Sequence, residues 1–446
     1  MRAARGKFYT ACDRIEFDSV LCDECLAVTQ PIPVHQFDNG LVLLAEPMEW
    51  LESAAFTLLV PAGCNYDPPD ALGLANLTCE MVQRGCGSRD SRQFVNDLEM
   101  LGADTSASVS NGHCSFGGAM PAESLHEALG IYADVVRRPH LPAEQLEDAR
   151  LGCLQEIRSL EDDLPQKVFQ QLRELRYGDP YGRSTSGQIA AVEHIGLDAI
   201  QRFAHRVYRP NGAILSVAGK IDWPRLRDHV AELFADWQPQ TASIAEESPA
   251  RENRRHVVVE SSQTHIGIAF PSAAYSDPDY FQARGAVGVL SDGMSSRLFT
   301  EVRERRGLVY AVYAACHSLR DRGSVLCYAG TSSERAQQTL DVLLEEFLRL
   351  AEGIGEDELL RLKAKIKSGL VMQQESSSSR SGSIAADWYH LGRVYTLDEL
   401  GRIVDGLSCQ SINRYLAEHP PRDFTIVTLG PKALEFPLGV SPAHPE

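Results

Sequence analysis

Apolar side chains dominate residues 73–82, GLANLTCEMV, at the spacing of a buried helix. Stop and cap signals come just before it, in the Pro-Pro-Asp run at residues 68–70. Gly85 follows it at the position where a helix commonly ends. The sequence therefore predicts a helix over residues 73–82.

A narrow polar seam interrupts the apolar surface of this helix. Asn76, Glu80 and Gln83 are spaced four and three residues apart, which makes them neighbours on one helical face, with Cys79 beside them. Polar groups on a buried helix need partners, since an unpaired buried polar group costs stability. The seam is thus either a site or what remains of one.

A second amphipathic helix is predicted over residues 141–160, LPAEQLEDARLGCLQEIRSL. Pro142 fits its first turn, and Glu144 lies near the positive end of the helix dipole. Glu156 falls at the edge of its apolar stripe, where a carboxylate needs a partner or stays at the margin of the core. A boundary salt bridge is the ordinary explanation for such a residue. The stripe consists of Leu146, Ala149, Cys153, Ile157 and Leu160.

Strand patterns open each half of the chain, long helical patterns follow, and a strand closes each half. The opening strands are LVLLAEP and AFTLLVPAG in the first half, and HVVVES and HIGIAFPS in the second. Strands segregated from helices indicate an α+β fold, with helices packed on one face of a mostly antiparallel sheet.

The two halves repeat each other at an offset of 211 residues. RFAHRVYRPNGAILSVAG, which ends at Gly219, resembles RYLAEHPPRDFTIVTLG, which ends at Gly430. The same offset pairs Gly112 with Gly323. A period this long is too great for a solenoid, so it indicates two copies of one domain.

Between the copies, QPQTASIAEESPARENRR is rich in Pro, Ser, Glu and Arg and has almost no large apolar side chain, as expected of a linker. The serine-rich tract ESSSSRSGS, residues 375–383, has a linker-like composition but follows a helical run, so we interpret it as a helix junction. The predicted parts are an extension at 1–30, an N-terminal domain at 31–237, a linker at 238–255 and a homologous C-terminal domain at 256–446.

Composition describes a globular protein, with 43% hydrophobic and 23% charged residues in a chain of 446. The net charge of −18 argues against a nucleic-acid partner. It suits a solvated surface, or a chamber that attracts basic peptides. No apolar run approaches the ~18 residues of a membrane span, so we expect none.

The start of the chain is polar and lacks the apolar core of a secretory signal, so we expect a cytoplasmic protein. Most of its eleven cysteines should then be reduced thiols. Cys22 and Cys25 form a single CxxC motif, with Cys12 upstream. One such pair without nearby histidines is a weak signal for metal or redox chemistry.

From about residue 30 onward the chain resembles the pitrilysin/insulinase family of zinc peptidases, most closely its mitochondrial-processing-peptidase-like branch. The resemblance is carried by GLAN at the start of the first helix, by ESLHEAL and by LQEIRSLEDD. It implies two homologous domains that together form half of a clamshell chamber.

The resemblance also implies a zinc site that this chain has lost. Active members carry His-x-x-Glu-His on the corresponding helix, with a distal glutamate about 76 residues onward. The histidines bind zinc and the intervening glutamate is the base for the metal-bound water. The matching positions here are Asn76, Cys79 and Glu80, so only the distal ligand remains, as Glu156.

Oxygen ligands from Asn76, Glu80 and Glu156 suit Mg²⁺ or Ca²⁺ better than Zn²⁺. Cys79 could supply a thiolate, but it occupies the position of the base and not that of a ligand. We expect no metal in this chain and a vacated site closed by hydrogen bonds among Asn76, Glu80 and Glu156.

The second copy carries a different family feature, SSRLFTEVRERRGLVYAVY at residues 295–313. In the family, an arginine and a tyrosine seven residues apart help to hold the substrate backbone near the zinc, and Arg303 and Tyr310 match that spacing. An ordinary solvated helix end is the alternative, with Arg305 near the negative pole and Gly307 as the C-terminal cap.

Together these features predict a pseudoenzyme: a non-catalytic, substrate-binding subunit that pairs with a zinc-bearing homologue to cleave peptides. The zinc is expected in that partner. Pairing with a second copy of the chain stays open. The rival hypothesis is a non-proteolytic structural or assembly subunit, and an active peptidase with an unorthodox metal ranks last.

Overall fold

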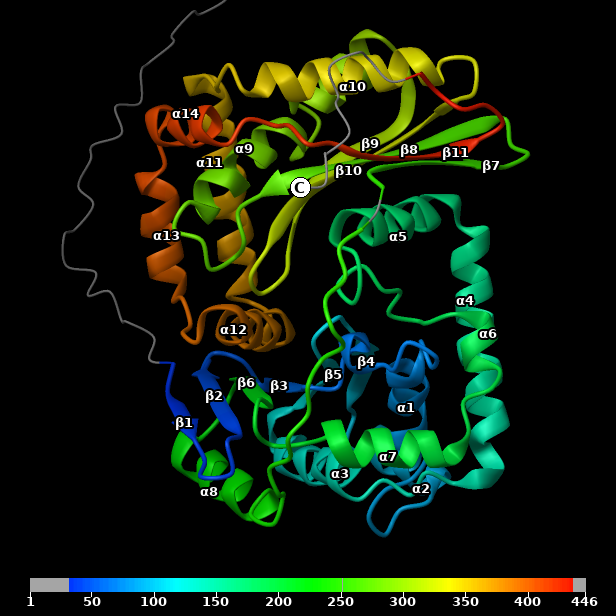
Figure 1. The fold of residues 1–446 in the computed structure, drawn as a ribbon. Coiled ribbons are helices and arrows are strands. Elements are labelled where there is room, and N and C mark those ends of the chain that lie inside the picture. Colours follow the sequence, from blue (N-terminus) through cyan, green and yellow to red (C-terminus); the bar gives the residue numbers. More distant parts are fainter. Residues whose placement is uncertain (1–31, 251, 436–446) are drawn as a thin grey trace, which may run out of the picture.

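The computed structural model describes residues 32–250 and 252–435. It contains two domains, each built on one mixed sheet with helices around it (Figure 1). The predicted α+β fold is confirmed. The expected N-terminal extension and the cysteines Cys12, Cys22 and Cys25 lie outside the described residues.

The first domain has a six-stranded sheet of order β1-β2-β6-β3-β5-β4. Its strands are β1 (Val34–Gln36), β2 (Val42–Pro47), β3 (Ser53–Val60), β4 (Asp104–Val109), β5 (Cys114–Pro121) and β6 (Ile214–Gly219). Its helices are α1 (Leu74–Val82), α2 (Ser91–Met100), α3 (Leu125–Arg137), α4 (Leu146–Asp162), α5 (Leu164–Tyr177), α6 (Ile189–Val192), α7 (Leu197–Val207) and α8 (Trp223–Leu233).

The second domain has a five-stranded sheet of order β7-β11-β8-β10-β9. Its strands are β7 (Arg254–Val258), β8 (Gln263–Ser272), β9 (Val309–Ser318), β10 (Gly323–Ser332) and β11 (Thr425–Gly430). Its helices are α9 (Tyr280–Ser291), a π-helical segment (Phe299–Arg305), α10 (Ala336–Leu350), α11 (Glu356–Gln373), α12 (Ser377–Leu391), α13 (Leu397–Gly406) and α14 (Cys409–Glu418).

The repeat in the sequence is also a repeat of strand order. The closing strands β6 and β11 are displaced by 211 residues at both ends, from 214 to 425 and from 219 to 430. In the first sheet β6 pairs in parallel with β2 and antiparallel with β3, and in the second sheet β11 pairs in parallel with β7 and antiparallel with β8. The strand that begins the second repeat, β7, starts at Arg254, so the last two residues of the predicted linker belong to it.

The strands of the first sheet are apolar on both faces because both faces are covered. Leu43 and Phe56 belong to the core shared with α1 and α3. Val42 and Leu44, one position along β2, face the opposite way and pack against Ile384 of α12. Successive strand residues point to opposite faces, so burial of both faces gives a continuous apolar run.

The two domains exchange one helix each. Helix α12 of the second domain lies over β3 and β6 of the first sheet, and α5 of the first domain lies against β8 and β11 of the second (Figure 1). On α5, Val168 packs so closely that a Cβ at Gly267 would come within 2.4 Å of its Cγ1. Helical patterning alone cannot show which sheet a helix covers, so the sequence did not predict this exchange.

The serine-rich tract is explained by this exchange. The break between α11 and α12 lies where we predicted a helix junction, but most of the tract forms the first turns of α12. Its short side chains allow α12 to lie close to the sheet. Ser381 illustrates this, because its Oγ lies 3.0 Å from Thr57 Oγ1 and its carbonyl accepts a hydrogen bond from Ser216 Oγ at 2.7 Å.

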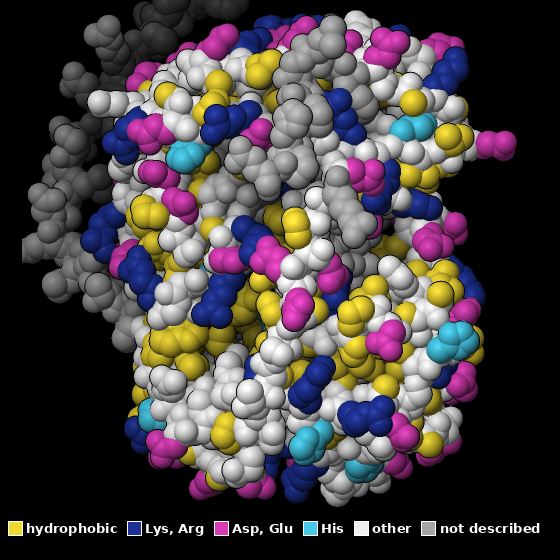
Figure 2. Space-filling model, viewed as in Figure 1, with side chains coloured by type: hydrophobic (Ala, Val, Ile, Leu, Met, Phe, Trp, Pro, Cys, Tyr) yellow, Lys and Arg dark blue, Asp and Glu magenta, His cyan; other side chains and the backbone are white. Residues whose placement is uncertain are grey.

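Basic and acidic side chains are interspersed on the face drawn in Figure 2, which carries no continuous basic stripe. Hydrophobic side chains are visible in the recess between the two halves of the molecule. No helix within residues 32–250 and 252–435 is long and apolar enough to cross a lipid bilayer.

Candidate functional site

Helix α1 begins on a well-fixed turn. Gly73 adopts φ 106°, in the left-handed region that favours glycine. The buried carboxylate of Asp67 accepts hydrogen bonds from the backbone N–H groups of Gly73 and Ala75, both at 2.8 Å. Asp67 therefore caps the helix, whereas the sequence pointed to Asp70. Arg183 holds this turn by donating from Nη1 to the carbonyl of Asp67 at 2.7 Å.

The polar seam of α1 meets α4 through Asn76. Asn76 Nδ2 donates to Glu156 Oε2 at 3.0 Å, as expected from the sequence. The other carboxylate oxygen, Glu156 Oε1, accepts a hydrogen bond from Ser186 Oγ at 2.6 Å. No sequence pattern pointed to Ser186, which belongs to a loop remote from both helices along the chain. Neutral donors thus occupy both oxygens of the remaining zinc-ligand position.

The other seam positions do not join this cluster. Cys79 is buried, and its Sγ lies 3.2 Å from the Sγ of Cys114 on β5. Its interaction with the Cys114 thiol, together with burial, raises the pKa of Cys79 well above its usual value. Glu80 is exposed, and its side chain makes no hydrogen bond or ion pair within the described ranges. We expected hydrogen bonds among Asn76, Glu80 and Glu156, but only Asn76 and Glu156 of these three are bonded to each other in the described structure. Gln83 is satisfied within α1 by donating to the carbonyl of Cys79 at 2.9 Å.

These four positions do not fit zinc. Asn76 turns an N–H toward Glu156 and so acts as a donor where a zinc ligand must offer a lone pair. The thiol of Cys79 stays protonated and faces the core. Glu80 offers a carboxylate at a ligand position, but it is exposed and makes no hydrogen bond with Asn76 or Glu156. Glu156 is the one other carboxylate at a ligand position, and its two oxygens already accept hydrogen bonds, so these residues do not form a structural or catalytic zinc site.

A cavity of about 1010 Å³ lies beside this cluster, and Glu156 and Ser186 belong to its wall. The other wall residues come from the C-terminal part of α4, the length of α5, the loop at residues 178–188, the linker residues 248–250, 252 and 255, and Leu72 before α1. Sequence patterns did not predict the cavity, because its walls come from five segments brought together only by the fold.

Arg303 lies on the π-helical segment of the second domain. Its guanidinium carbon is 4.9 Å from the ring centroid of Phe299. Within the described ranges the exposed Arg303 side chain makes no hydrogen bond or ion pair, so its donors face solvent. π-helical turns are rare and are frequently found at functional sites.

Tyr310 is the second residue of β9, which forms an edge of the second sheet. Val309 pairs with Thr331 and Ala311 with Gly330, so the register shifts at Tyr310 and leaves it on an irregularity of the strand. Its side chain is 77% exposed. A tyrosine this exposed on an edge strand presents its hydroxyl to whatever occupies the adjacent space.

The turn between these two residues is also a well-formed helix end. Gly307 has φ 58° and its carbonyl accepts a hydrogen bond from Arg335 Nη1 at 2.7 Å. The exposed Arg305 pairs at 2.6 Å with Glu301, whose side chain is largely buried. The alternative interpretation, an ordinary solvated helix end, therefore accounts for Arg305 and Gly307. It does not account for Arg303 and Tyr310, which take no part in ending the helix.

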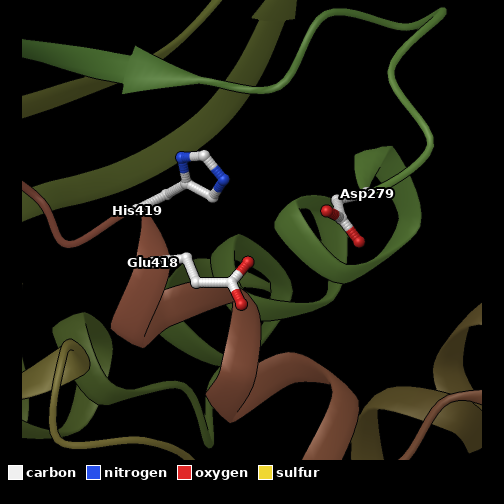
Figure 3. A group of neighbouring side chains, drawn as sticks. All are labelled: Asp279, Glu418 and His419. Carbon is white, nitrogen blue, oxygen red and sulfur yellow. The ribbon is translucent and has the colours of Figure 1, made fainter.

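A separate group of ligand-type side chains lies in the second domain. Asp279 at the start of α9 and Glu418 and His419 at the end of α14 bring their ligand atoms within 4.8 Å of one another (Figure 3). Sequence patterns missed this group because helix packing brings distant residues together. Glu418 and His419 are exposed, and exposed acidic groups gather on surfaces without any ion, so the group alone does not indicate a metal centre.

Two family models match the chain in succession. The model described as Insulinase (Peptidase family M16) matches residues 45–188, and the model described as Peptidase M16 inactive domain matches residues 194–366. The chain belongs to the insulinase family. The family predicted from the helix motifs is thereby confirmed.

Relatives of this insulinase-family chain match over almost its whole described length. An uncharacterized zinc protease of Rickettsia bellii is 25% identical over 405 residues, which cover 90% of this chain and 98% of the relative. One from Bacillus subtilis is 24% identical, with 88% and 97% covered. The solved structure of a peptidase M16 inactive domain from Pseudomonas fluorescens superposes with a TM-score of 0.83 at 22% identity, covering 91% of this chain and 100% of that one.

Proposed function

We propose that this insulinase-family chain is a non-catalytic subunit of a two-chain zinc metallopeptidase, of the mitochondrial-processing-peptidase-like type. It binds the peptide substrate, and a homologous subunit carries the zinc. The observation that carries this proposal is the contrast between the two halves of the chain. In the first domain an amide and an unengaged glutamate stand at the histidine positions and a buried thiol stands at the position of the base. Arg303 and Tyr310 of the second domain stay exposed, and their side chains have no hydrogen-bond or ion-pair partner among the described residues.

Arg303 and Tyr310 supply the chemistry for holding a peptide. A guanidinium and a phenol are fixed hydrogen-bond donors that polarise a carbonyl and stabilise the oxyanion that develops on it. The stacking of Arg303 on Phe299 limits the conformations of its side chain, so less entropy is lost on binding. In the proposed pair these donors face the scissile peptide in a chamber shared with the zinc-bearing domain of the partner.

A heterodimer follows more directly from these residues than a homodimer does. Two copies of this chain bring together two sets of Asn76, Cys79 and Glu80 and no histidine ligand at those positions. Hydrolysis then requires a partner with an intact His-x-x-Glu-His motif. The site of action we propose is the cytoplasm.

The test is co-expression with a zinc-bearing homologue, followed by size-exclusion chromatography and a peptide-cleavage assay. We expect a stable complex of one copy of each chain and cleavage by the complex that exceeds that of either chain alone. A complex that forms but cleaves no faster than the zinc-bearing chain alone would favour the rival function, a structural or assembly subunit.

A further inference from the structure

The cavity beside Glu156 is partly open to solvent, and many of its lining residues carry polar or charged side chains. Its linker wall is held in place because Ser248 and Asp179 exchange two backbone hydrogen bonds, at 2.9 and 2.8 Å. Its volume of about 1010 Å³ is large enough for several residues of an extended peptide or for a small ligand.

Most charged groups in the cavity wall already have partners. Arg183 forms two hydrogen bonds with Asp179, at 2.6 and 2.7 Å. Arg255 pairs with Glu252 at 2.7 Å and with Glu174 at 3.2 Å. Glu156 accepts hydrogen bonds from Asn76 and Ser186, and Glu161 is exposed to solvent.

Arg173 is the exception among the arginines of this wall. It is half-buried, and its one hydrogen bond goes from Nη2 to the neutral Gln170 Oε1, at 2.9 Å. Within the described residues no carboxylate oxygen lies within 4.0 Å of its side-chain nitrogens. Burial lowers the pKa of Arg173, and the groups that oppose this shift are Tyr177 and Cys64, which are uncharged at neutral pH. Removing a guanidinium from water without pairing it with an anion lowers the stability of the folded protein.

Lys167, another cation of the same wall, likewise has no acidic partner in the part of the chain that the structure describes. The cavity also contains amides that are not used by the fold. Gln171 Oε1 is buried without a hydrogen-bond partner. Gln166 and Gln188, which are exposed at the margin of the cavity, also have side chains that make no hydrogen bond within the described ranges. An amide offers both donor and acceptor, which matches the N–H and C=O groups of a peptide backbone.

We propose that this cavity binds a peptide through its carboxylate, with Arg173 and Lys167 as the cationic contacts and the glutamine amides as backbone contacts. The ligand chemistry is a carboxylate at the end of a peptide or on an Asp or Glu side chain. The proposal rests on the proposed function only in taking the ligand to be a peptide. It places a second holding point for peptides in the first domain, apart from Arg303 and Tyr310.

The experiment uses the full chain alone and three nine-residue peptides labelled at the N-terminus. The first has a free C-terminal carboxylate and no acidic side chain, the second is its C-terminal amide, and the third is the amide with one internal Asp. Fluorescence anisotropy gives the dissociation constants. We expect the free-acid or the Asp peptide to bind at least tenfold more tightly than the plain amide. The reason is that hydrogen bonds between charged groups are stronger than those between neutral groups. Which of the two binds identifies the source of the carboxylate.

Arg173→Gln should abolish this preference. The substitution keeps hydrogen-bonding capacity and removes a half-buried charge that lacks an anion, so thermal unfolding should show no loss of stability. Arg158→Gln is the matched control, because Arg158 is exposed on α4 and does not line the cavity. Equal binding of all three peptides to the unaltered chain would overturn the proposal, as would an unchanged preference in Arg173→Gln. Because the assay omits the zinc-bearing partner, its failure is distinguishable from failure of the paired function.

Discussion

Arg380 on α12 and Glu46 on β2 form an ion pair between the two domains, with Nη2 2.6 Å from Oε2. Arg380 Nε also donates to the same oxygen at 2.7 Å. The exposed fractions of the two side chains are 1% and 2%. The pair therefore fixes one of the exchanged helices on the sheet of the other domain, in a region from which water is excluded.

Loss of either member of this pair should be costly, because it leaves the other charge buried without compensation. Arg380→Ala is expected to lower the free energy of unfolding by about 3–5 kcal/mol. Urea unfolding followed by circular dichroism measures this change. Arg305→Ala is the control, because Arg305 is exposed and Glu301 keeps Arg349 as a second cation at 4.0 Å, so the loss should be no more than about 1 kcal/mol. Equal effects of the two substitutions would show that the buried pair does not hold the domains together.

Two histidines at the helix-exchange contacts should make the fold sensitive to acid. His317 Nδ1 lies 2.8 Å from the hydroxyl of Tyr177 at the end of α5, and the His113 ring packs edge-on against Tyr389 of α12. Burial lowers the pKa of each histidine to about 4, against about 6.5 in the unfolded chain.

The unfolded chain therefore binds more protons than the folded one between these two pKa values. The stabilising contribution is complete above about pH 6.5 and declines as the pH falls toward 4. At pH 5 the loss should reach roughly 2 kcal/mol for each histidine. Urea unfolding at pH 7.5 and pH 5 tests this, and a double variant with His113→Gln and His317→Gln should show a smaller difference between the two pH values. An identical pH dependence in the variant would contradict the assignment.

Much of the fold could be predicted from the sequence because its signals are local. The helix predicted over residues 73–82 is observed at Leu74–Val82, and the 211-residue repeat appears as matching strands. The exchange of α5 and α12 could not be predicted, because an apolar helix face does not specify which apolar surface covers it. The serine-rich tract at residues 375–383 was predicted as a helix junction, but most of it lies within α12. Its composition suits either structure, so composition alone could not decide between them.

The candidate site was only partly predictable for the same reason. The resemblance to the family's zinc motif related Asn76 to Glu156, and the hydrogen bond between them follows that expectation. Ser186 and Asp67 were missed because each acts through a contact set by loop geometry, with no periodicity to reveal it. Glu80 was expected in the cluster, but helical spacing alone does not determine whether a long side chain turns inward or toward solvent.

The purified chain should bind little zinc, because the residues at the metal site of the first domain do not form a ligand set. With an amide donor at Asn76 and a buried protonated thiol at Cys79, the chain should contain well under one zinc per molecule. Elemental analysis by plasma mass spectrometry measures it. Stoichiometric zinc that disappears in Glu156→Ala would mean that the first domain keeps a working metal site.

Rebuilding the site should separate metal binding from hydrolysis. Asn76→His with Glu80→His supplies two imidazoles beside Glu156, so this double variant should bind zinc and remain inactive. Activity should require Cys79→Glu as well, which restores the base. Cys79 faces Cys114 in the core, so this third substitution should also lower stability. Hydrolysis by the double variant would show that the base at position 79 is dispensable.

The central claim concerns Tyr310 in the assembled pair. Tyr310→Phe removes one exposed hydroxyl, so it should leave folding and dimer assembly unchanged. Arg303→Ala should act in the same direction, and the double variant should fall short of additivity if both donors hold one group. Arg305→Ala, on the exposed turn between them, should have little effect.

The most direct measurement is kcat for peptide cleavage by the purified heterodimer with unaltered Tyr310 and with Tyr310→Phe. The loss of one donor to a developing oxyanion should lower kcat by about 10²-fold while the complex elutes unchanged in size-exclusion chromatography. Equal kcat in the two complexes would contradict a substrate-holding role for this chain and leave assembly as its function.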